Sequence, residues 1–531
     1  MPNQKLYLKY QVQAEPLLRQ WYAVSLLIPP ATGAMFLANS HVKIMKSYVL
    51  SPEMHAAASQ DPSLIGGPFI NYQEDRTEEV GALLERTLRE KKHIIDFAGG
   101  VRALDEMLRK EAGGFSLEPL YPKVPEPLRG YVELVYDLNN ASSFRFIEHL
   151  LYRSPIYDSQ SQGIGLTLVS RDDRPFVMST PRLEDGGYMH LNIPFADRRL
   201  DDLFRLRSEP RPMGEIKEML GVDGEGGELF GSFFTPEAPG PPAVPRYEGE
   251  GMRVRYFGHA CLLVETRNVS ILTDPMISYK YDSDIPRFTF ADLPERIDYV
   301  LITHAHLDHI VLEPLLQLRH KIGQIVVPRN GGGFLQDPSL KLLLNSVGFH
   351  NVVDVDEFES VRFEGGEVIS LPFFGEHHDL NIRSRTGYLI SSGGKSVAIA
   401  ADSCNLETRL CEYIHAEFGD IDALFLGMEC DGAPLSWFYG PLLTRSLDRR
   451  MDYSRQGSAC NYARAIDMTT ALGCKSVWIY AMGLEPWLNY IMSINWTEES
   501  VQITESNKFV DDCRGRGIGA ERLFGQKTIL L

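Results

Sequence analysis

Metal-binding side chains gather in one short stretch of the 531-residue chain, His304-Ala-His306-Leu-Asp308-His309. An apolar run, Tyr299 to Ile302, stands directly before it and predicts a buried strand. Histidines at alternate positions project to one side of extended backbone, and the Asp-His pair follows where a helical pattern begins. Imidazoles and carboxylates this dense are costly to bury without an ion. The stretch therefore predicts a metal site in which each pair of ligands serves one of two metals.

Two further groups of liganding side chains stand at the ends of predicted strands. Val368 to Phe374 is expected to be a strand that ends in Gly375-Glu376-His377-His378, and Ser396 to Ala401 a strand that ends at Asp402. Strands alternate with helical segments through this region, which is typical of a layered α/β domain. The ligands would then lie on loops along one edge of a sheet.

Composition limits the classes of partner and compartment. A hydrophobic content of 44% and a charged content of 23% are those of an ordinary globular protein, and no apolar run approaches the length of a transmembrane helix. The formal net charge of −18 argues against nucleic acid or an anionic membrane as the main partner. The N-terminus lacks the pattern of a secretory signal, and the seven cysteines form no Cys-x-x-Cys pair, which predicts reduced thiols in the cytoplasm.

A proline-rich stretch divides the chain. Thr235 to Pro245 contains five prolines in eleven residues, which can continue neither a helix nor an interior strand. We therefore predict an α+β N-terminal domain over residues 1–234, a semi-rigid linker over 235–246 and an α/β domain over 247–531.

The N-terminal domain is predicted to contain helices followed by short strands. Glu78 to Lys92 and Val101 to Lys110 have apolar residues at helical spacing, with Gly99-Gly100 between them. We expect the glycine pair to separate two helices.

The residues that could bind metal resemble the signature of the metallo-β-lactamase superfamily. The resemblance covers about residues 247–531 and implies an αββα sandwich with a two-metal site. The matching segments are His304-x-His306-x-Asp308-His309, Gly258-His259-Ala260, Thr273-Asp274-Pro275, the loop from Gly375 to His378, and Asp402 after an apolar strand.

The chain departs from the hydrolases of that superfamily, which usually add a histidine on the fourth loop and another near the C-terminus. After Asp402 the only histidine is His415, inside a predicted helix. Carboxylates are hard donors that offset the charge of two irons and favour their oxidised states, whereas zinc hydrolases favour neutral imidazole. The ligand set therefore favours a diiron oxygenase over a zinc enzyme. The predicted metal ligands are His304, His306, Asp308, His309, Glu376 and Asp402.

The whole chain, in length and two-part layout, is similar to the CmlA-like family of nonheme diiron β-hydroxylases. The tail from Tyr480 to Tyr490 also resembles that family. The resemblance implies a cofactor of two Fe ions (Fe2+/Fe3+), O2 as cosubstrate and an external electron donor. It further implies hydroxylation of the β-carbon of an amino acid that is held as a thioester on the phosphopantetheine arm of a nonribosomal peptide synthetase carrier domain.

Two alternatives remain open from the sequence. The first is a zinc-dependent hydrolase of an ester, lactone, thioester or phosphodiester, which the missing late histidine weakens. The second is a carrier-binding protein without catalysis, which the complete set of six ligands weakens. The sequence does not identify the amino acid, the synthetase or the electron donor.

Individual roles follow from position. Asp402 is the candidate bridge between the metals, and Glu376 is the candidate mobile carboxylate. Alternatively His377 or His378 is the ligand and Glu376 accepts a hydrogen bond from it. Glu429, after a predicted strand, could reach the cluster or its proton network, or be an ordinary loop carboxylate. His259, at a turn, is expected to support the site rather than to bind metal.

A basic cluster and an aromatic segment lie in the second domain. Arg445, Arg449, Arg450 and Arg455 could contact the phosphate of the phosphopantetheine arm or an acidic carrier helix, or could form a solvated helix face. Trp437-Phe438-Tyr439 could line a substrate pocket, although core packing is the commoner role of such a segment. By resemblance, the N-terminal domain would help to bind the carrier or form a homodimer.

Overall fold

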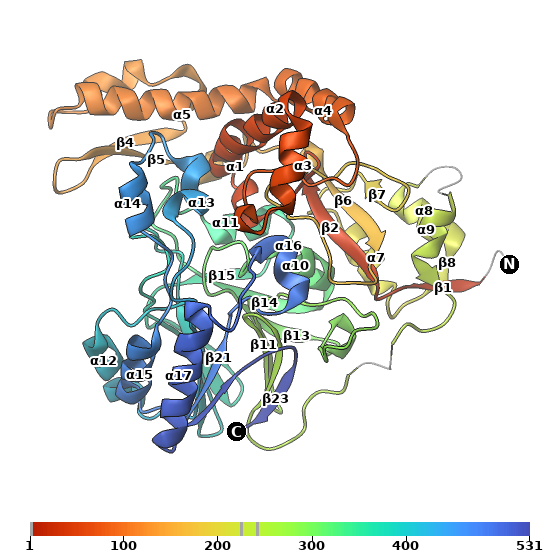
Figure 1. Cartoon of the computed structure of the whole chain (residues 1–531), viewed down its shortest axis with the longest axis vertical. Helices are drawn as coiled ribbons and strands as arrows, with labels where there is room; N and C mark the ends of the chain where they lie inside the picture. The colour runs from red at the N-terminus through yellow and green to blue at the C-terminus, as the bar shows by residue number, and fades with distance from the viewer. Residues whose placement is uncertain (1–3, 223–226, 241–243) are drawn as a thin grey trace.

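The computed structural model describes residues 4–222, 227–240 and 244–531. Within them, two seven-stranded sheets face each other in the C-terminal half of the chain (Figure 1). Of the predicted linker, residues 241–243 lie outside the described residues. The described parts on either side form no helix, and Val244 makes a single bridge to Pro294.

The first sheet is parallel from β12 to β15 and antiparallel through β10 to β12 and β23. Its central strands are buried on both faces and rich in β-branched residues, as expected for strands covered on both sides. In spatial order the strands are β15 (Val352–Val355), β14 (Ile322–Pro328), β13 (Ile297–Leu301), β12 (Ser270–Thr273), β11 (Cys261–Glu265), β10 (Arg253–Gly258) and β23 (Lys527–Leu530).

The second sheet repeats this plan, with an antiparallel half and a parallel half that meet at β19. Its parallel strands end at the same sheet edge, which places the loops that follow them side by side. In spatial order the strands are β16 (Ser360–Phe363), β17 (Gly366–Leu371), β18 (Gly387–Ser392), β19 (Lys395–Ala401), β20 (Ala423–Gly427), β21 (Ser476–Tyr480) and β22 (Gly519–Arg522).

Apolar side chains fill the space between the sheets, including Val254, Ile271, Ile399 and Phe425. A second apolar cluster lies under the helices that cover the second sheet, α12 (Thr408–Phe418), α15 (Tyr462–Ala471) and α17 (Val501–Gly515). The first sheet is covered by α10 (Leu312–Leu318), α11 (Leu340–Ser346) and the N-terminal half of the chain (Figure 1). The layers are therefore those of an αββα sandwich.

The N-terminal half mixes helices and short sheets. One buried apolar cluster contains side chains of this half together with those of the first sheet and α10, so the two halves share a core. Its main elements are β1 (Lys5–Leu8), β2 (Val12–Leu18), β3 (Trp21–Tyr22), α1 (Pro30–Phe36), α2 (Val42–Leu50), α3 (Pro52–Gln60), α4 (Thr77–Glu90), α5 (Lys92–Glu111), β4 (Val132–Tyr136), β5 (Ser142–Phe146), β6 (Gln162–Leu168), β7 (Met189–Leu191), α7 (Arg199–Arg205), β8 (Arg211–Pro212), α8 (Met213–Leu220) and β9 (Phe234–Thr235).

The expected break at Gly99-Gly100 is wrong, because α5 runs through both residues and the helices separate at Lys91. A Cβ atom on Gly100 would lie 3.3 Å from the side chain of Leu128, so the glycine permits close packing rather than a turn. Among the helices of the described residues, none combines the length and the apolar character needed to cross a bilayer.

Candidate metal centre

Turns at the ends of strands carry the candidate ligands. The His304 to His309 stretch follows β13 of the first sheet, whereas Glu376 and Asp402 follow β17 and β19 of the second. Non-glycine residues in these turns adopt a left-handed backbone, with φ of 61° at Glu376 and 47° at Ala401. Such conformations cost free energy and persist where the surrounding structure enforces them, which is common at functional sites.

Each of the three signature histidines has one ring nitrogen held by the protein. The carboxylate of Asp274 accepts hydrogen bonds from the Thr303 hydroxyl at 2.6 Å and from His309 Nδ1 at 2.9 Å. Because the single hydroxyl hydrogen of Thr303 is donated to Asp274, its oxygen accepts from His304 Nδ1 at 3.0 Å. With Nδ1 held in this way, the Nε2 atoms of His304 and His309 are the nitrogens available to ligate a metal.

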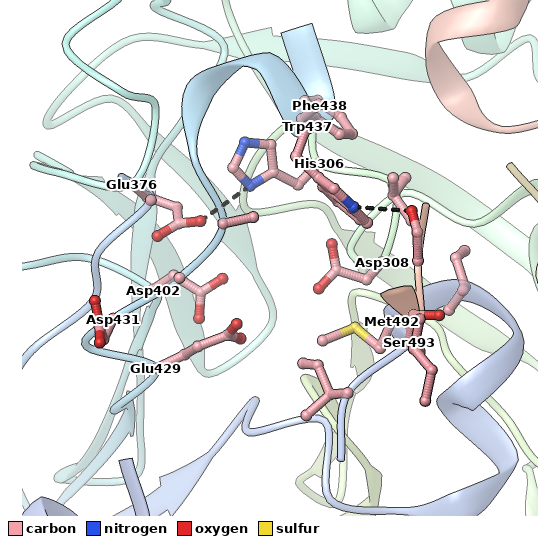
Figure 2. Close-up of a pocket in the computed structure, with 18 of the residues that line it drawn as sticks. His306, Asp308, Glu376, Asp402, Glu429, Asp431, Trp437, Phe438, Met492 and Ser493 are labelled. Atoms are coloured by element: carbon pink, nitrogen blue, oxygen red, sulfur yellow. Dashed lines mark hydrogen bonds and ion pairs between the residues drawn. The ribbon is translucent and has the colours of Figure 1, made fainter. Parts of the chain in front are cut away.

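In His306 the two ring nitrogens have exchanged roles, since Nε2 contacts the protein and Nδ1 points to a candidate ligand. His306 Nε2 lies 3.2 Å from the hydroxyl of Tyr439, and its Nδ1 lies 3.4 Å from a carboxylate oxygen of Glu376 (Figure 2). The free nitrogens of the signature thus face the carboxylates that arrive from the second sheet.

Asp402 lies between the histidines. One of its carboxylate oxygens is 2.9 Å from His309 Nε2 and 3.6 Å from His304 Nε2. Asp308 lies 3.6 Å from His309 Nε2 on the side of His259, whose Nε2 is 3.0 Å from the same carboxylate oxygen. Asp402 is therefore the carboxylate that faces two imidazoles at once.

Polar atoms at this centre fit a cation. His304 Nε2, His309 Nε2 and Asp402 Oδ1 are buried and have no hydrogen-bond partner. Removal from bulk water, together with the neighbouring carboxylates Asp402 and Asp308, raises the pKa of Glu429 to about 8. The same causes raise the pKa of Glu376 well above its ordinary value. Burial alone would lower the pKa of His309, but the neighbouring carboxylates Asp308, Asp402 and Asp274 raise it well above its ordinary value. Bound metal ions would take the place of these protons and offset the crowded negative charge, so the donor set fits the predicted cofactor.

The fourth loop places its three candidate ligands differently. Glu376 lies beside His306, 3.4 Å from its Nδ1, whereas His378 Nδ1 lies 2.8 Å from the carbonyl oxygen of Arg455. His377 is fully buried, stacks on His306 with ring centroids 4.4 Å apart, and has no hydrogen-bond partner on either nitrogen. Glu376 and His377 are both beside the centre, and of the three only His378 is held away from it.

A cavity of about 390 Å³ opens above the candidate ligands. Figure 2 shows Glu376, Asp402 and Glu429 on one side and Asp308 opposite them, with His306 beside Glu376. The rest of the wall includes the polar residues Asp431, Ser493 and Asn495 and a larger set of apolar side chains. These apolar side chains are Leu307, Trp437 and Phe438, and Ile491, Met492, Ile494 and Trp496 from the C-terminal segment, with Ile65 of the N-terminal half.

The N-terminal half therefore contributes to the cavity directly. The carbonyl oxygen of Gly66 accepts a hydrogen bond from Trp437 Nε1 at 3.1 Å, which ties this segment to the cavity wall (Figure 2). Tyr439 is buried and contacts His306, so the aromatic segment combines a pocket wall with core packing.

The other predicted residues lie further out. His415 is at the surface in α12, where its Nε2 contacts Asp420 at 2.8 Å. Arg445 and Arg449 are exposed and are not among the residues that line the cavity. Sequence reasoning quoted Asp274 as part of a motif and did not assign its contact with His309. It missed Thr303, for which the available signal was a polar residue that ends a buried strand.

Replacing Asp274 with asparagine is expected to weaken iron binding by about 10- to 100-fold. The substitution exchanges the carboxylate that orients His309 and Thr303 for a neutral amide. Asp467 on α15, which is exposed and does not line the cavity, provides a matched Asp→Asn control. Retention of iron against increasing chelator concentration measures the effect. Equal retention by the Asp274→Asn variant and the unchanged enzyme would contradict the role of this carboxylate.

The paired sheets and the signature define the class of fold. A family model described as a β-lactamase superfamily domain matches residues 253–428, and one described as the diiron non-heme β-hydroxylase N-terminal domain matches residues 7–239. The 4-amino-L-phenylalanyl-[CmlP-peptidyl-carrier-protein] 3-hydroxylase of Streptomyces venezuelae is 38% identical over 530 residues, which cover 99% of each chain. The chain therefore belongs to the family of nonheme diiron β-hydroxylases.

Solved structures agree with this assignment. The crystal structure of CmlA, a diiron β-hydroxylase from Streptomyces venezuelae, superimposes with a TM-score of 0.91 at 36% identity and covers 100% of both chains. A mutant of the same enzyme gives a TM-score of 0.89 at 36% identity, covering 99% of this chain and 100% of the other. These findings confirm the predicted fold class and enzyme class, a cofactor of two iron ions, and O2 as oxidant.

Proposed function

We propose that the enzyme hydroxylates the β-carbon of an amino acid held as a thioester on a nonribosomal peptide synthetase carrier domain. The observation that carries this proposal is the meeting of three imidazoles and three carboxylates at the floor of one apolar cavity. The S. venezuelae relative, whose name specifies an aminoacyl carrier protein as substrate, supports the choice of substrate class. Tethering would supply the amino acid at high effective concentration.

We further propose how the ligands are shared. His304, His306 and Glu376 would hold one iron, Asp308 and His309 the other, and Asp402 would contact both. When bound, the iron pair would supply the redox chemistry in which O2, two external electrons and two protons give one oxygen atom to a C–H bond and the other to water. Asp274 and Thr303 hold the Nδ1 atoms of His309 and His304, so that Nε2 of each ring is the nitrogen left for a metal.

The rest of the cavity would position the substrate. Trp437, Phe438 and Ile494 present apolar surface that excludes water and can pack against an amino-acid side chain. Glu429 lies in the same wall beside Asp402, and we propose its carboxyl group as the one that holds a proton near the reacting oxygen.

The direct test offers reduced enzyme and O2 to carrier domains loaded with single amino acids. Mass spectrometry of the carrier is expected to show one added oxygen atom, which comes from isotopically labelled O2 and is located on the β-carbon. Iron content and the optical spectrum separate this function from the alternative, a zinc hydrolase of an ester, lactone or phosphodiester. Zinc without an absorbing band, together with release of the amino acid, would overturn the proposal.

The fourth-loop ligand can be assigned by paired variants. Glu376→Ala is expected to lose about one iron per chain, because it removes an anionic donor beside His306. His377→Ala removes a buried ring that stacks on the same histidine, and is expected to retain both irons. Iron analysis of the two purified variants decides, and the reverse pattern would make His377 the ligand.

The proposal also covers the compartment, the electron donor and the assembly of the enzyme. All seven cysteines lie in the described part of the chain as free thiols, which supports a cytoplasmic enzyme. An electron donor must supply the reducing equivalents. A homodimer through the N-terminal domain is our expectation for the assembly, and sedimentation measurements would test it.

A further inference from the structure

A basic helix stands beside the cavity. The helix α14 (Arg449–Ser454) packs against α13 (Leu435–Tyr439), whose aromatic residues line the cavity (Figure 1). Arg445, Arg449 and Arg450 are all exposed. In the described part of the chain, none of their guanidinium groups forms an ion pair with a carboxylate.

The acidic residues of the same segment are already engaged. Asp448 accepts a hydrogen bond from the backbone nitrogen of Arg450 at 2.9 Å and caps the helix. Asp452 accepts from the backbone nitrogen and the hydroxyl of Ser436, at 2.8 and 2.5 Å. Residues 445–455 contain four arginines and two aspartates, so this segment has a net positive charge in a chain whose formal net charge is −18. Such a local field attracts an anionic partner.

Apolar groups are exposed on the same helix. Met451 and Tyr453 are 60% and 52% exposed, and the Arg449 guanidinium lies 5.4 Å from the centre of the Tyr453 ring. Arginine, tyrosine and methionine are the residues enriched in protein–protein interfaces. The surface formed by Arg445, Arg449, Arg450, Met451 and Tyr453, which we call the α14 surface, has this composition.

Two connections join the α14 surface to the cavity. Through Ser436, Asp452 holds the start of α13, directly before the cavity residues Trp437 and Phe438. Beyond the helix, Arg455 Nε donates to the carbonyl oxygen of His378 at 2.8 Å, and Gly457 lies in the cavity wall. A partner docked on this surface would therefore stand at the rim of the cavity that holds the candidate ligands.

We propose that the α14 surface is the docking site for the loaded carrier domain, whose acidic side chains and phosphopantetheine phosphodiester would contact Arg445, Arg449 and Arg450. This inference rests on the proposed function. Arginine suits the phosphodiester because its planar donors match phosphate oxygens in pairs. The flexible pantetheine chain would then enter between Trp437 and the opposite wall, with the amino acid ahead of it.

Binding of the CmlP peptidyl carrier protein, loaded with 4-amino-L-phenylalanine through its phosphopantetheine arm, tests the inference. The triple variant R445E/R449E/R450E is expected to bind this probe at least about 30-fold more weakly, since reversing charges at a complementary rim slows encounter and loosens the complex. A control variant, K5E/R409E/R514E, makes the same change in net charge at exposed residues elsewhere, and is expected to stay within about twofold of the unchanged enzyme. Iron content and melting temperature verify the folding of both variants.

The phosphate contact has its own readout. Removing the arm from the carrier is expected to weaken binding to the unchanged enzyme, and to matter less for the triple variant, because both changes remove the same contact. Equal loss in the triple variant and the control would overturn the inference, as would undiminished binding by the triple variant. Binding to anionic phosphatidylserine vesicles in place of the carrier would also overturn it. If the unchanged enzyme binds the carrier but adds no oxygen, the docking site stands and the proposed function fails.

Discussion

Replacing Asp402 with alanine is expected to empty the metal centre and to abolish hydroxylation. Asp402 is the one carboxylate that faces both His304 and His309, at 3.6 and 2.9 Å. Without it, the free nitrogens of these imidazoles keep no anionic partner from the second sheet. Iron in the purified variant should fall from two ions per chain to a small fraction of one. Turnover should fall by at least about 1,000-fold, which corresponds to about 4 kcal/mol of barrier.

Asp431 provides the matched control for this substitution. It lies in the wall of the same cavity (Figure 2) but is exposed and belongs to no group of closely spaced metal-binding atoms in the described chain. Asp431→Ala should keep both irons and the optical spectrum of the unchanged enzyme. Metal analysis of the two variants side by side is the measurement. If Asp402→Ala kept both ions, the shared role of this carboxylate would be wrong.

The sequence predicted the elements that carry the candidate ligands because each has a local signature. The strand predicted over Ser396 to Ala401 agrees with β19 to within one residue, and the one predicted over Val368 to Phe374 overlaps β17, since short β-branched runs between turn residues are specified locally. The ligands from His304 to His309 could be predicted for the same reason, because they are neighbours in one short stretch of sequence. Glu376 and Asp402 could be proposed because each follows a buried strand.

The cavity above the site could not be predicted by the same means. Its walls combine Ile65 and Gly66 with Trp437 and Met492, which are separated by hundreds of residues and share no local pattern. The role of Gly100 was mistaken for a similar reason, because the side chain of Leu128 that packs on it comes from another element. Contacts that depend on tertiary packing leave little trace in local periodicity.

Buried charges between the two halves of the chain form another feature that the sequence does not reveal. Arg174, with only 9% of its side chain exposed, contacts Glu15 on β2 at 2.7 Å and Glu313 on α10 at 2.8 Å. Burial alone would raise the pKa of Glu15, but Arg182 and Arg174 lower it to about 2. The Arg174 guanidinium also lies 3.5 Å from the centre of the Tyr490 ring.

Replacing Arg174 with methionine is therefore expected to destabilise the enzyme by about 3 to 5 kcal/mol, because it leaves the buried Glu313 carboxylate without a cation. Glu15 would keep Arg182 at 2.7 Å, whereas Glu313 would keep only the Tyr279 hydroxyl at 2.6 Å. Urea-induced unfolding followed by tryptophan fluorescence measures the change, with the midpoint and the slope compared between the variant and the unchanged enzyme.

A second variant separates the loss of charge from the loss of packing. Adding Glu313→Gln to Arg174→Met removes the unpaired carboxylate, so the double variant should recover more than about 1 kcal/mol of the loss. Tyr490 directly precedes cavity residues, and its carbonyl oxygen accepts from the backbone nitrogen of Val177 at 2.8 Å. The single variant should therefore also raise KM for the loaded carrier. Unchanged stability in Arg174→Met would show that these charges do not hold the two halves together. An unchanged KM in a destabilised variant would separate this contact from the cavity wall.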